Sequence, residues 1–299
     1  MLKTILHRGM ALLGLAALGS CAAATPPAAP VAKPALWQVS DADTTVYLFG
    51  TIHLLPEQYR WRSAAFDTAI RNSQSLIVET IVDEKHPEEI SGVLMRLGLS
   101  TTVPPLTQRV APDKRAALKA AIAKSGLPET AFDHMETWAA AFMLLGNQFR
   151  DLGLKGTEGV ESVLRGNFTA AGKPVGQLET NAEQLGFFDT LPEEAQRALL
   201  EGAIEQPEAM RDEFDSMLKA WTRGDVEEIA KTFNADLASS PALMDALIRR
   251  RNANWSHWVE RRLATPGTVM VAVGAGHLAG DGSVIAMLQR DGYKVRRVQ

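Results

Sequence analysis

Two histidines occur in the same unusual setting in distant parts of the chain. Each follows a short apolar run rich in β-branched residues, and each comes three positions after a glycine: Gly50 precedes His53, and Gly274 precedes His277. The chain has only six histidines, so two of them in matching settings are informative. A buried strand that breaks at a glycine and then presents an imidazole is typical of the edge of an active site.

Two glutamates are placed in the same way between these histidines. Glu79 follows the apolar run 75–78, and Glu179 follows the run 173–178. In open sheets, ligands bind beyond the carboxyl ends of parallel strands. If the strands before these four residues are neighbours, two imidazoles and two carboxylates converge on one crevice.

Two imidazoles with one or two carboxylates are a suitable ligand set for a catalytic divalent metal ion. The metal lowers the pKa of a bound water and polarises a carbonyl group. A carboxylate that does not bind the metal can then accept the proton of the water. A single histidine or glutamate after a strand is usually structural, so the prediction rests on the repetition. The residues alone leave open which carboxylate binds and which accepts protons.

Arg251, followed by Asn252 and Trp255, comes shortly before the second histidine strand and has two interpretations. An arginine here could clamp a carboxylate or neutralise a developing oxyanion. The residues alone favour a basic helix surface instead, because the same segment carries four more arginines: Arg249, Arg250, Arg261 and Arg262.

The other histidines and the remaining motifs indicate no competing site. His7 lies in a leader segment, and His86, His134 and His257 lie in polar or helical contexts that favour the surface. The chain has no His-Glu-x-x-His helix and no Gly-x-Ser-x-Gly elbow, so neither a zincin nor a serine hydrolase is expected.

The elements that position these residues form strands at both ends of a helical middle. Strands are expected at 36–40, 45–49, 75–78, 173–178, 268–273 and 293–298, the first two as a hairpin and the last at an edge. Residues 54–56 are expected to form a loop. Helical periodicity is expected at 63–72, 87–97, 112–124, 136–152, 181–188, 192–204, 207–221, 226–233, 241–263 and 283–290. This order predicts an α/β fold: a central mixed sheet with a large helical insertion and an active site at the strand C-terminal ends.

Composition and the N-terminus predict an exported globular protein. With 299 residues, 46% hydrophobic, and a net charge of -4, the chain is ordinary for a large domain and unsuited to nucleic acid. Lys3 and Arg8 precede the apolar run 10–18, which is too short to span a bilayer. Leu-Gly-Ser before Cys21 resembles a bacterial lipobox; a plain secretory signal cut after residue 22, 23 or 24 is the alternative.

The features of the N-terminal segment predict three parts of the chain. Residues 1–20 are predicted to be a signal peptide, 21–34 a lipidated Cys21 with a Pro/Ala-rich tether, and 35–299 the catalytic domain. The lipid would anchor a periplasmic protein to the outer membrane. Cys21 is the only cysteine, so the domain forms no disulfide.

The paired motifs resemble the TraB/GumN family, which includes the Tiki metalloproteases and is distantly similar to erythromycin esterases and ChaN haem-binding proteins. The resemblance runs from residue 36 to residue 293 and keeps the order and spacing of several motifs. These motifs are residues 47–53, the strand that ends at Glu79, residues 159–161, residues 178–180 with 184–185, Arg251-Asn252 with Trp255, and residues 273–280.

The resemblance implies a site built from His53, His277 and Glu79, and a divalent-metal-dependent protease in the Tiki branch. Arg251 and Glu179 also match family positions. Bacterial GumN-like members mostly have no assigned substrate, so the fold and the site follow from the resemblance more firmly than protease activity does.

Three functions are compatible with these residues. The first is a hydrolase, peptidase-like, in which Mn, Co or Zn is bound by His53, Glu79 and His277. The second is an esterase-type hydrolase in which His53 and Glu79 activate water without a metal. The third is an envelope protein that binds a metal or haem without turnover. The expected partners are a peptide or small-molecule substrate and, through Cys21, a membrane.

Overall fold

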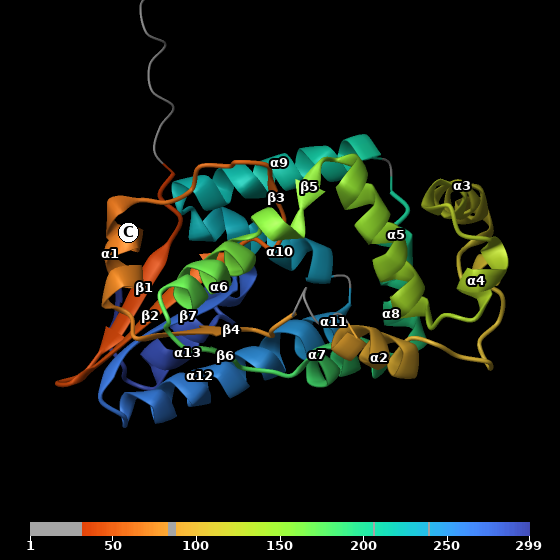
Figure 1. Cartoon of the computed structure of the whole chain (residues 1–299). Helices are drawn as coiled ribbons and strands as arrows, with labels where there is room; N and C mark the ends of the chain where they lie inside the picture. Colours follow the sequence, from red (N-terminus) through yellow and green to blue (C-terminus); the bar gives the residue numbers. More distant parts are fainter. Residues whose placement is uncertain (1–31, 83–87, 206, 239) are drawn as a thin grey trace, which may run out of the picture. The chain divides into compact units, whose positions relative to one another are not determined.

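A computed structural model describes residues 32–82, 88–205, 207–238 and 240–299 of the chain (Figure 1). These residues belong to one compact unit. The predicted signal peptide, Cys21 and His86 lie outside the described residues. The end of the predicted tether is described: Ala32 is buried, and the Lys33 N–H donates a hydrogen bond to the Thr222 carbonyl at 2.8 Å. Within the described part of the chain, no helix is both long and apolar enough to cross a membrane.

A six-stranded mixed sheet carries the candidate residues, with the strand order β6-β4-β7-β2-β1-β8. Its strands are β1 Leu36–Ser40, β2 Thr44–Thr51, β4 Ser75–Val78, β6 Val175–Gln177, β7 Gly267–Gly274 and β8 Val295–Arg297. The four strands β6, β4, β7 and β2 run parallel, whereas β1 pairs antiparallel with both β2 and β8. The predicted mixed sheet, N-terminal hairpin and C-terminal edge strand are confirmed.

The central strands are buried on both faces. Along β7, Met270 and Ala272 join one hydrophobic cluster, and Val269, Val271 and Val273 join another on the opposite face. Successive side chains of a strand point to opposite faces, so a continuous apolar run is what a strand covered on both sides requires.

Helices cover both faces of the sheet. The cluster on one face includes residues of α1 Ala64–Asn72, α6 Val160–Ala170, α9 Pro207–Arg223 and α10 Val226–Ala238. The cluster on the other face includes residues of α12 Arg250–Leu263 and α13 Val284–Arg290. Figure 1 shows α12 and α13 running beside the strands.

A helical insertion between the strands has a hydrophobic core of its own, which includes Leu106, Phe132, Leu144 and Leu200. The predicted insertion is therefore confirmed. The remaining helices are α2 Glu88–Leu97, η1 Leu106–Gln108, η2 Pro112–Lys114, α3 Arg115–Ser125, α4 Glu129–Asp133, α5 Thr137–Asp151, η3 Gly156–Glu158, α7 Asn181–Asp189, α8 Glu193–Gly202 and α11 Pro241–Met244.

The structure departs from the sequence expectations at two places near the site. Residues 54–56 were expected to be a loop, and this was wrong: β3 Leu55–Pro56 pairs antiparallel with β5 Leu154–Lys155. A strand of two residues is too short to show an alternation of apolar and polar side chains, so the sequence could not predict it. The stretch 241–263 is helical but interrupted, because the π turn η4 Asp245–Arg249 separates α11 from α12. A π turn adds a residue to the helical repeat, and such turns are frequent at functional sites.

The contact between α6 and the segment after β2 gives a stability prediction. A Cβ on Gly159, which caps α6, would collide with the His53 carbonyl oxygen, whereas a Cβ on Gly166, within the same helix, meets nothing within 4 Å. We expect Gly159→Ala to lower the free energy of unfolding by about 1–3 kcal/mol. Gly166→Ala should raise it by up to about 1 kcal/mol, because alanine is the better helix former. Urea unfolding measures both, and equal effects of the two substitutions would contradict this packing.

Candidate active site

The parallel half of the sheet brings the four predicted residues to one edge. His53 follows β2, Glu79 follows β4, Glu179 follows β6 and His277 follows β7, and these four strands are neighbours. The backbone joins the two acidic ends directly, since the Glu179 N–H donates to the Glu79 carbonyl at 2.9 Å. The convergence expected from the strand ends is therefore present.

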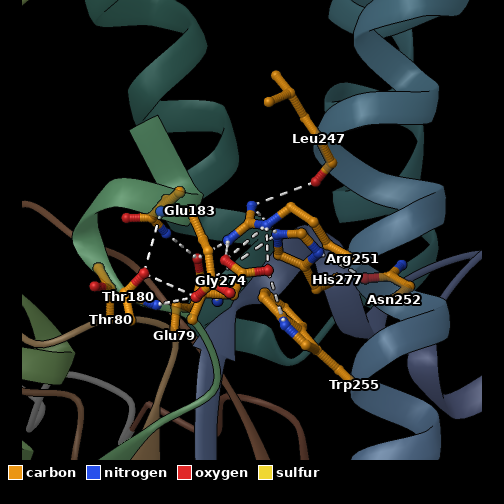
Figure 2. Close-up of polar contacts among 12 residues, drawn as sticks. Glu79, Thr80, Thr180, Glu183, Leu247, Arg251, Asn252, Trp255, Gly274 and His277 are labelled. Carbon is orange, nitrogen blue, oxygen red and sulfur yellow. Dashed lines mark hydrogen bonds and ion pairs between the residues drawn. The ribbon is translucent and has the colours of Figure 1, made fainter. Parts of the chain in front are cut away.

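Arg251 lies between the two carboxylates. Its Nε is 3.0 and 3.1 Å from the two oxygens of Glu179, and one terminal nitrogen donates to Glu179 Oε2 at 2.8 Å and to Glu79 Oε2 at 2.7 Å. All three side chains are buried, with residue exposures of 5–7%. The guanidinium also lies over the Trp255 ring, 4.6 Å from its centroid. Arg251 is thus a buried clamp and not part of a basic surface. Figure 2 shows its polar contacts with Glu79 and His277.

Further donors complete the hydrogen bonding of the carboxylates. The Gly274 N–H donates to Glu79 Oε1 at 2.7 Å, and the Gln184 amide donates to Glu79 Oε2 at 3.1 Å. The Trp255 indole N–H donates to Glu179 Oε1 at 3.0 Å. Buried carboxylates require such partners, because an unpaired buried charge is strongly unfavourable.

The two carboxyl groups have opposite pKa shifts. Burial raises the pKa of Glu79, but the charges of His277, Arg251 and His53 and the Gly274 N–H outweigh it and lower the pKa to about 2. Because His277 is uncharged at neutral pH, the charges of Arg251 and His53 and the Gly274 N–H are the causes that lower the pKa there. Burial raises the pKa of Glu179, and its bonds to Arg251 offset this only in part. Glu79 is therefore the firmly ionised carboxylate of the pair.

His277 is buried and held in one tautomer. It lies in the short helix η5 Ala275–Leu278, and its Nδ1 is 2.6 Å from Asn252 Oδ1. Asn252 is oriented by its own amide, which donates to the Gly282 carbonyl at 2.7 Å. Nδ1 therefore carries the hydrogen, and the Nε2 lone pair faces Arg251 at 3.3 Å and Glu79 Oε1 at 3.8 Å. Burial lowers the pKa of His277 to about 3, so the ring is neutral at physiological pH.

His53 has the same type of anchor in a different environment. Its Nδ1 is 2.7 Å from Glu161 Oε1, which also accepts a hydrogen bond from the Thr51 hydroxyl. The negative charge of Glu161 is the largest cause of a rise in the pKa of His53 to about 9. The His53 side chain is 65% exposed, so solvent screens part of this effect. The His53 side chain is therefore far more exposed than those of Glu79, Glu179 and His277.

The glycines of the two motifs let each motif approach the other. A Cβ on Gly274 would lie 3.2 Å from Glu79 Oε1, 3.5 Å from His277 Cδ2 and 3.6 Å from His53 Nε2. A Cβ on Gly50 would lie 3.0 Å from Ala275 Cα, in the second motif. Gly274 therefore lies between the two imidazoles and the ionised carboxylate, and a side chain at this position would make close contacts with all three.

Sequence reasoning missed two functional side chains, Glu161 and Asn252. Both accept hydrogen bonds from the Nδ1 atoms and so aim the Nε2 atoms. In the sequence, both residues stood out only because they belong to motifs that resemble the family, residues 159–161 and Arg251-Asn252. Glu161 reaches His53 because α6 begins beside β2, where the Val160 N–H donates to the Ile52 carbonyl at 3.0 Å.

His53, Glu79 and His277 are of the residue types that bind divalent metal ions. Metal-binding histidines typically donate their second ring N–H to a carboxylate or carbonyl oxygen, as both imidazoles do here. As they stand, no three His, Cys, Asp or Glu side chains of the described residues form a group that could hold an ion. Between Glu79 and His277 lies the guanidinium of Arg251, which contacts both side chains.

Comparison with known proteins assigns the family. A model of the TraB/PrgY/gumN family matches residues 35–297. The chain belongs to the TraB/PrgY/gumN family. The expected family resemblance is therefore confirmed over nearly the whole folded domain.

Members of the TraB/PrgY/gumN family in two enteric bacteria are similar to this chain. The uncharacterized protein YbaP of Escherichia coli (strain K12) is 24% identical over 243 residues, which is 81% of this chain and 87% of YbaP. YbaP of Shigella flexneri has the same identity and coverage. No solved structure matches the chain.

The burial of His277 predicts a pH-dependent stability. Its pKa is about 3 in the folded protein against 6.5 ordinarily, so the unfolded chain takes up a proton as the pH falls through 6.5 while the folded protein does not. The stability that neutral His277 contributes is therefore fully present above pH 6.5 and declines toward pH 3. In urea unfolding with a chelator present, the stability advantage of the wild type over His277→Gln should shrink from pH 7 to pH 4. A difference that stays constant over this range would contradict the assignment.

Proposed function

We propose that this protein is a divalent-metal-dependent hydrolase, peptidase-like in its chemistry, with its site at His53, Glu79 and His277. One observation carries the proposal: both imidazoles have Nδ1 bound to a side-chain oxygen, which directs His53 Nε2 toward Gly274 and His277 Nε2 toward the ionised Glu79, whose Oε1 lies 3.8 Å away. Structural histidines have no need of this convergence, whereas metal ligands do.

The residues of the site would divide the work as follows. His53, Glu79 and His277 would hold the ion, which when bound supplies a nucleophilic water and polarises a carbonyl. Glu161 and Asn252 fix the two rings. Arg251 holds Glu79 in place through a bond of 2.7 Å, and its charge is already engaged by two carboxylates. Substrate would approach from the side of His53, because His277 and Glu79 are only 5% exposed.

A second candidate is a hydrolase without metal, in which His53 and Glu79 activate water directly. The observation that favours it is the Arg251–Glu79 contact, since Arg251 already supplies Glu79 with a positive partner. Against it, Glu161 raises the pKa of His53, which favours the protonated ring over the form that could accept a proton from water; a metal ion bound at Nε2 would displace that proton. A non-catalytic protein that binds a metal or haem is the third candidate.

The proposed cellular setting is the periplasm. The apolar run 10–18 and the Leu-Gly-Ser-Cys sequence support export and lipidation at Cys21. A lipid anchor would hold the hydrolase at the outer membrane, where its substrate would be a peptide or a small molecule of the envelope.

Metal binding tests the proposal without a known substrate. We expect Mn²⁺ to bind the wild-type protein in calorimetry and Co²⁺ to give a visible absorption band, with both lost in His53→Ala and His277→Ala. Glu161→Gln should weaken binding by about 10–100-fold, because it removes the acceptor that aims the His53 ring. The control His257→Ala changes an exposed histidine that pairs with Glu260 and should bind like the wild type.

Hydrolysis of fluorescein-labelled casein and of p-nitrophenyl acetate then separates the candidates. Turnover that stops on chelation and returns with Mn²⁺ supports the metal hydrolase, whereas turnover that survives exhaustive chelation supports the metal-free enzyme. A Soret band on haem titration without hydrolysis supports the third candidate. Unchanged metal affinity in both histidine variants would contradict the proposed site.

A further inference from the structure

A cleft between α7 and α12 lies directly behind the acidic pair. It has a volume of about 540 Å³, within the range of small-molecule sites. Glu179 and Trp255 line it from within, and both also bind Arg251. One layer of side chains therefore separates this α7–α12 cleft from Glu79 and His277, and no step of the proposed hydrolysis uses it.

The α12 side of the cleft is a row of hydrogen-bond donors. Asn254, Trp258 and Arg261 lie at spacings of four and three residues, so they share one face of the helix. Among the described residues, no hydrogen bond or ion pair engages the amide, indole or guanidinium of these three side chains. Asn254 and Arg261 are exposed and Trp258 is half-buried, so these donors are open to a ligand that offers several acceptors.

The cleft carries two acidic and two basic side chains, and one of its cations has no charged partner among the described residues. Glu179 is paired with Arg251 and Arg250 with Asp245 at 3.1 Å, whereas Glu183 keeps its negative charge and accepts two hydrogen bonds from Thr180. Between the two cations that line the cleft, Arg261 is the one that makes no ion pair with another described residue, which makes it the group available to an anion. A guanidinium binds a carboxylate through parallel hydrogen bonds.

The walls of the cleft favour a flat ligand. Phe187 on α7 and Trp258 on α12 are half-buried, and Trp255 forms the inner wall. Gly186 leaves the α7 wall without a side chain, and a Cβ there would meet nothing within 4 Å. Aromatic walls provide large contact areas for a planar ring.

We propose that the α7–α12 cleft is a binding site for an aromatic carboxylate, with the carboxylate at Arg261 and Asn254 and the ring among Phe187, Trp255 and Trp258. A ligand in this place contacts Glu179 and Trp255, which together with Glu79 hold Arg251. A bound ligand would therefore influence how Arg251 is held, and through Arg251 the position of Glu79. The proposal does not depend on hydrolysis.

Calorimetric titration of the intact protein with 2-naphthoate tests the site. We expect saturable 1:1 binding, about tenfold weaker for Arg261→Gln and for the neutral probe 2-naphthamide, because each removes one of the two charges of the guanidinium–carboxylate pair. Gly186→Leu should abolish binding, because it fills the cleft while it improves the helix propensity of α7. Arg249→Gln makes the same charge change on an exposed residue outside the cleft and should bind like the wild type.

Several results would overturn the proposal. Absence of saturable binding to the wild type would do so, as would equal affinity for the carboxylate and the amide. Retained binding in Gly186→Leu, with its fold verified by circular dichroism, would place the ligand elsewhere. Loss of binding in His53→Ala would place the ligand at the histidine site instead, whereas unchanged binding in that variant supports a separate cleft.

Discussion

The ion pairs of Arg251 with Glu79 and Glu179 are the interaction on which the rest of the site depends. One guanidinium joins α12 to the ends of β4 and β6, in a setting where all three side chains are nearly inaccessible to water. Removal of one partner from a buried ion pair typically costs about 3–5 kcal/mol, because the other charge is left uncompensated. Glu79 can stay ionised at this depth because Arg251 and the Gly274 backbone oppose the cost of its burial.

The two Gly-x-x-His motifs share the same local arrangement but lie in different environments. In each, the imidazole donates Nδ1–H to a side-chain oxygen, and a glycine lets the other motif approach. Burial then lowers the pKa of His277 to about 3, while Glu161 raises that of His53 to about 9. Titratable groups whose surroundings move their pKa values apart are typical of sites with divided roles. Here the buried His277 ring is neutral at physiological pH, so its Nε2 keeps a lone pair, whereas the His53 ring is exposed to solvent.

The strand ends were predictable because a parallel strand buried on both faces must be apolar throughout and must end where its first polar side chain leaves the core. Glu179 follows the edge strand β6, whose residues are only half-buried or exposed, whereas Glu79 and His277 follow from that rule. Arg251 does not, because its neighbours Arg249 and Arg250 are exposed and the π turn before it changes which face of the helix is buried. Nor does Asn252 or Glu161, since their partners are distant in the sequence and only the folded chain brings them together.

If the two motifs and Glu79 form a single ion site, anomalous diffraction from crystals soaked in Mn²⁺ should locate the ion there. We expect one anomalous peak bonded to His53 Nε2, His277 Nε2 and a Glu79 oxygen, with the Nδ1 contacts to Glu161 and Asn252 retained. Full occupancy of Mn²⁺ elsewhere, or crystals without a peak in which Arg251 still contacts Glu79 and His277, would contradict it.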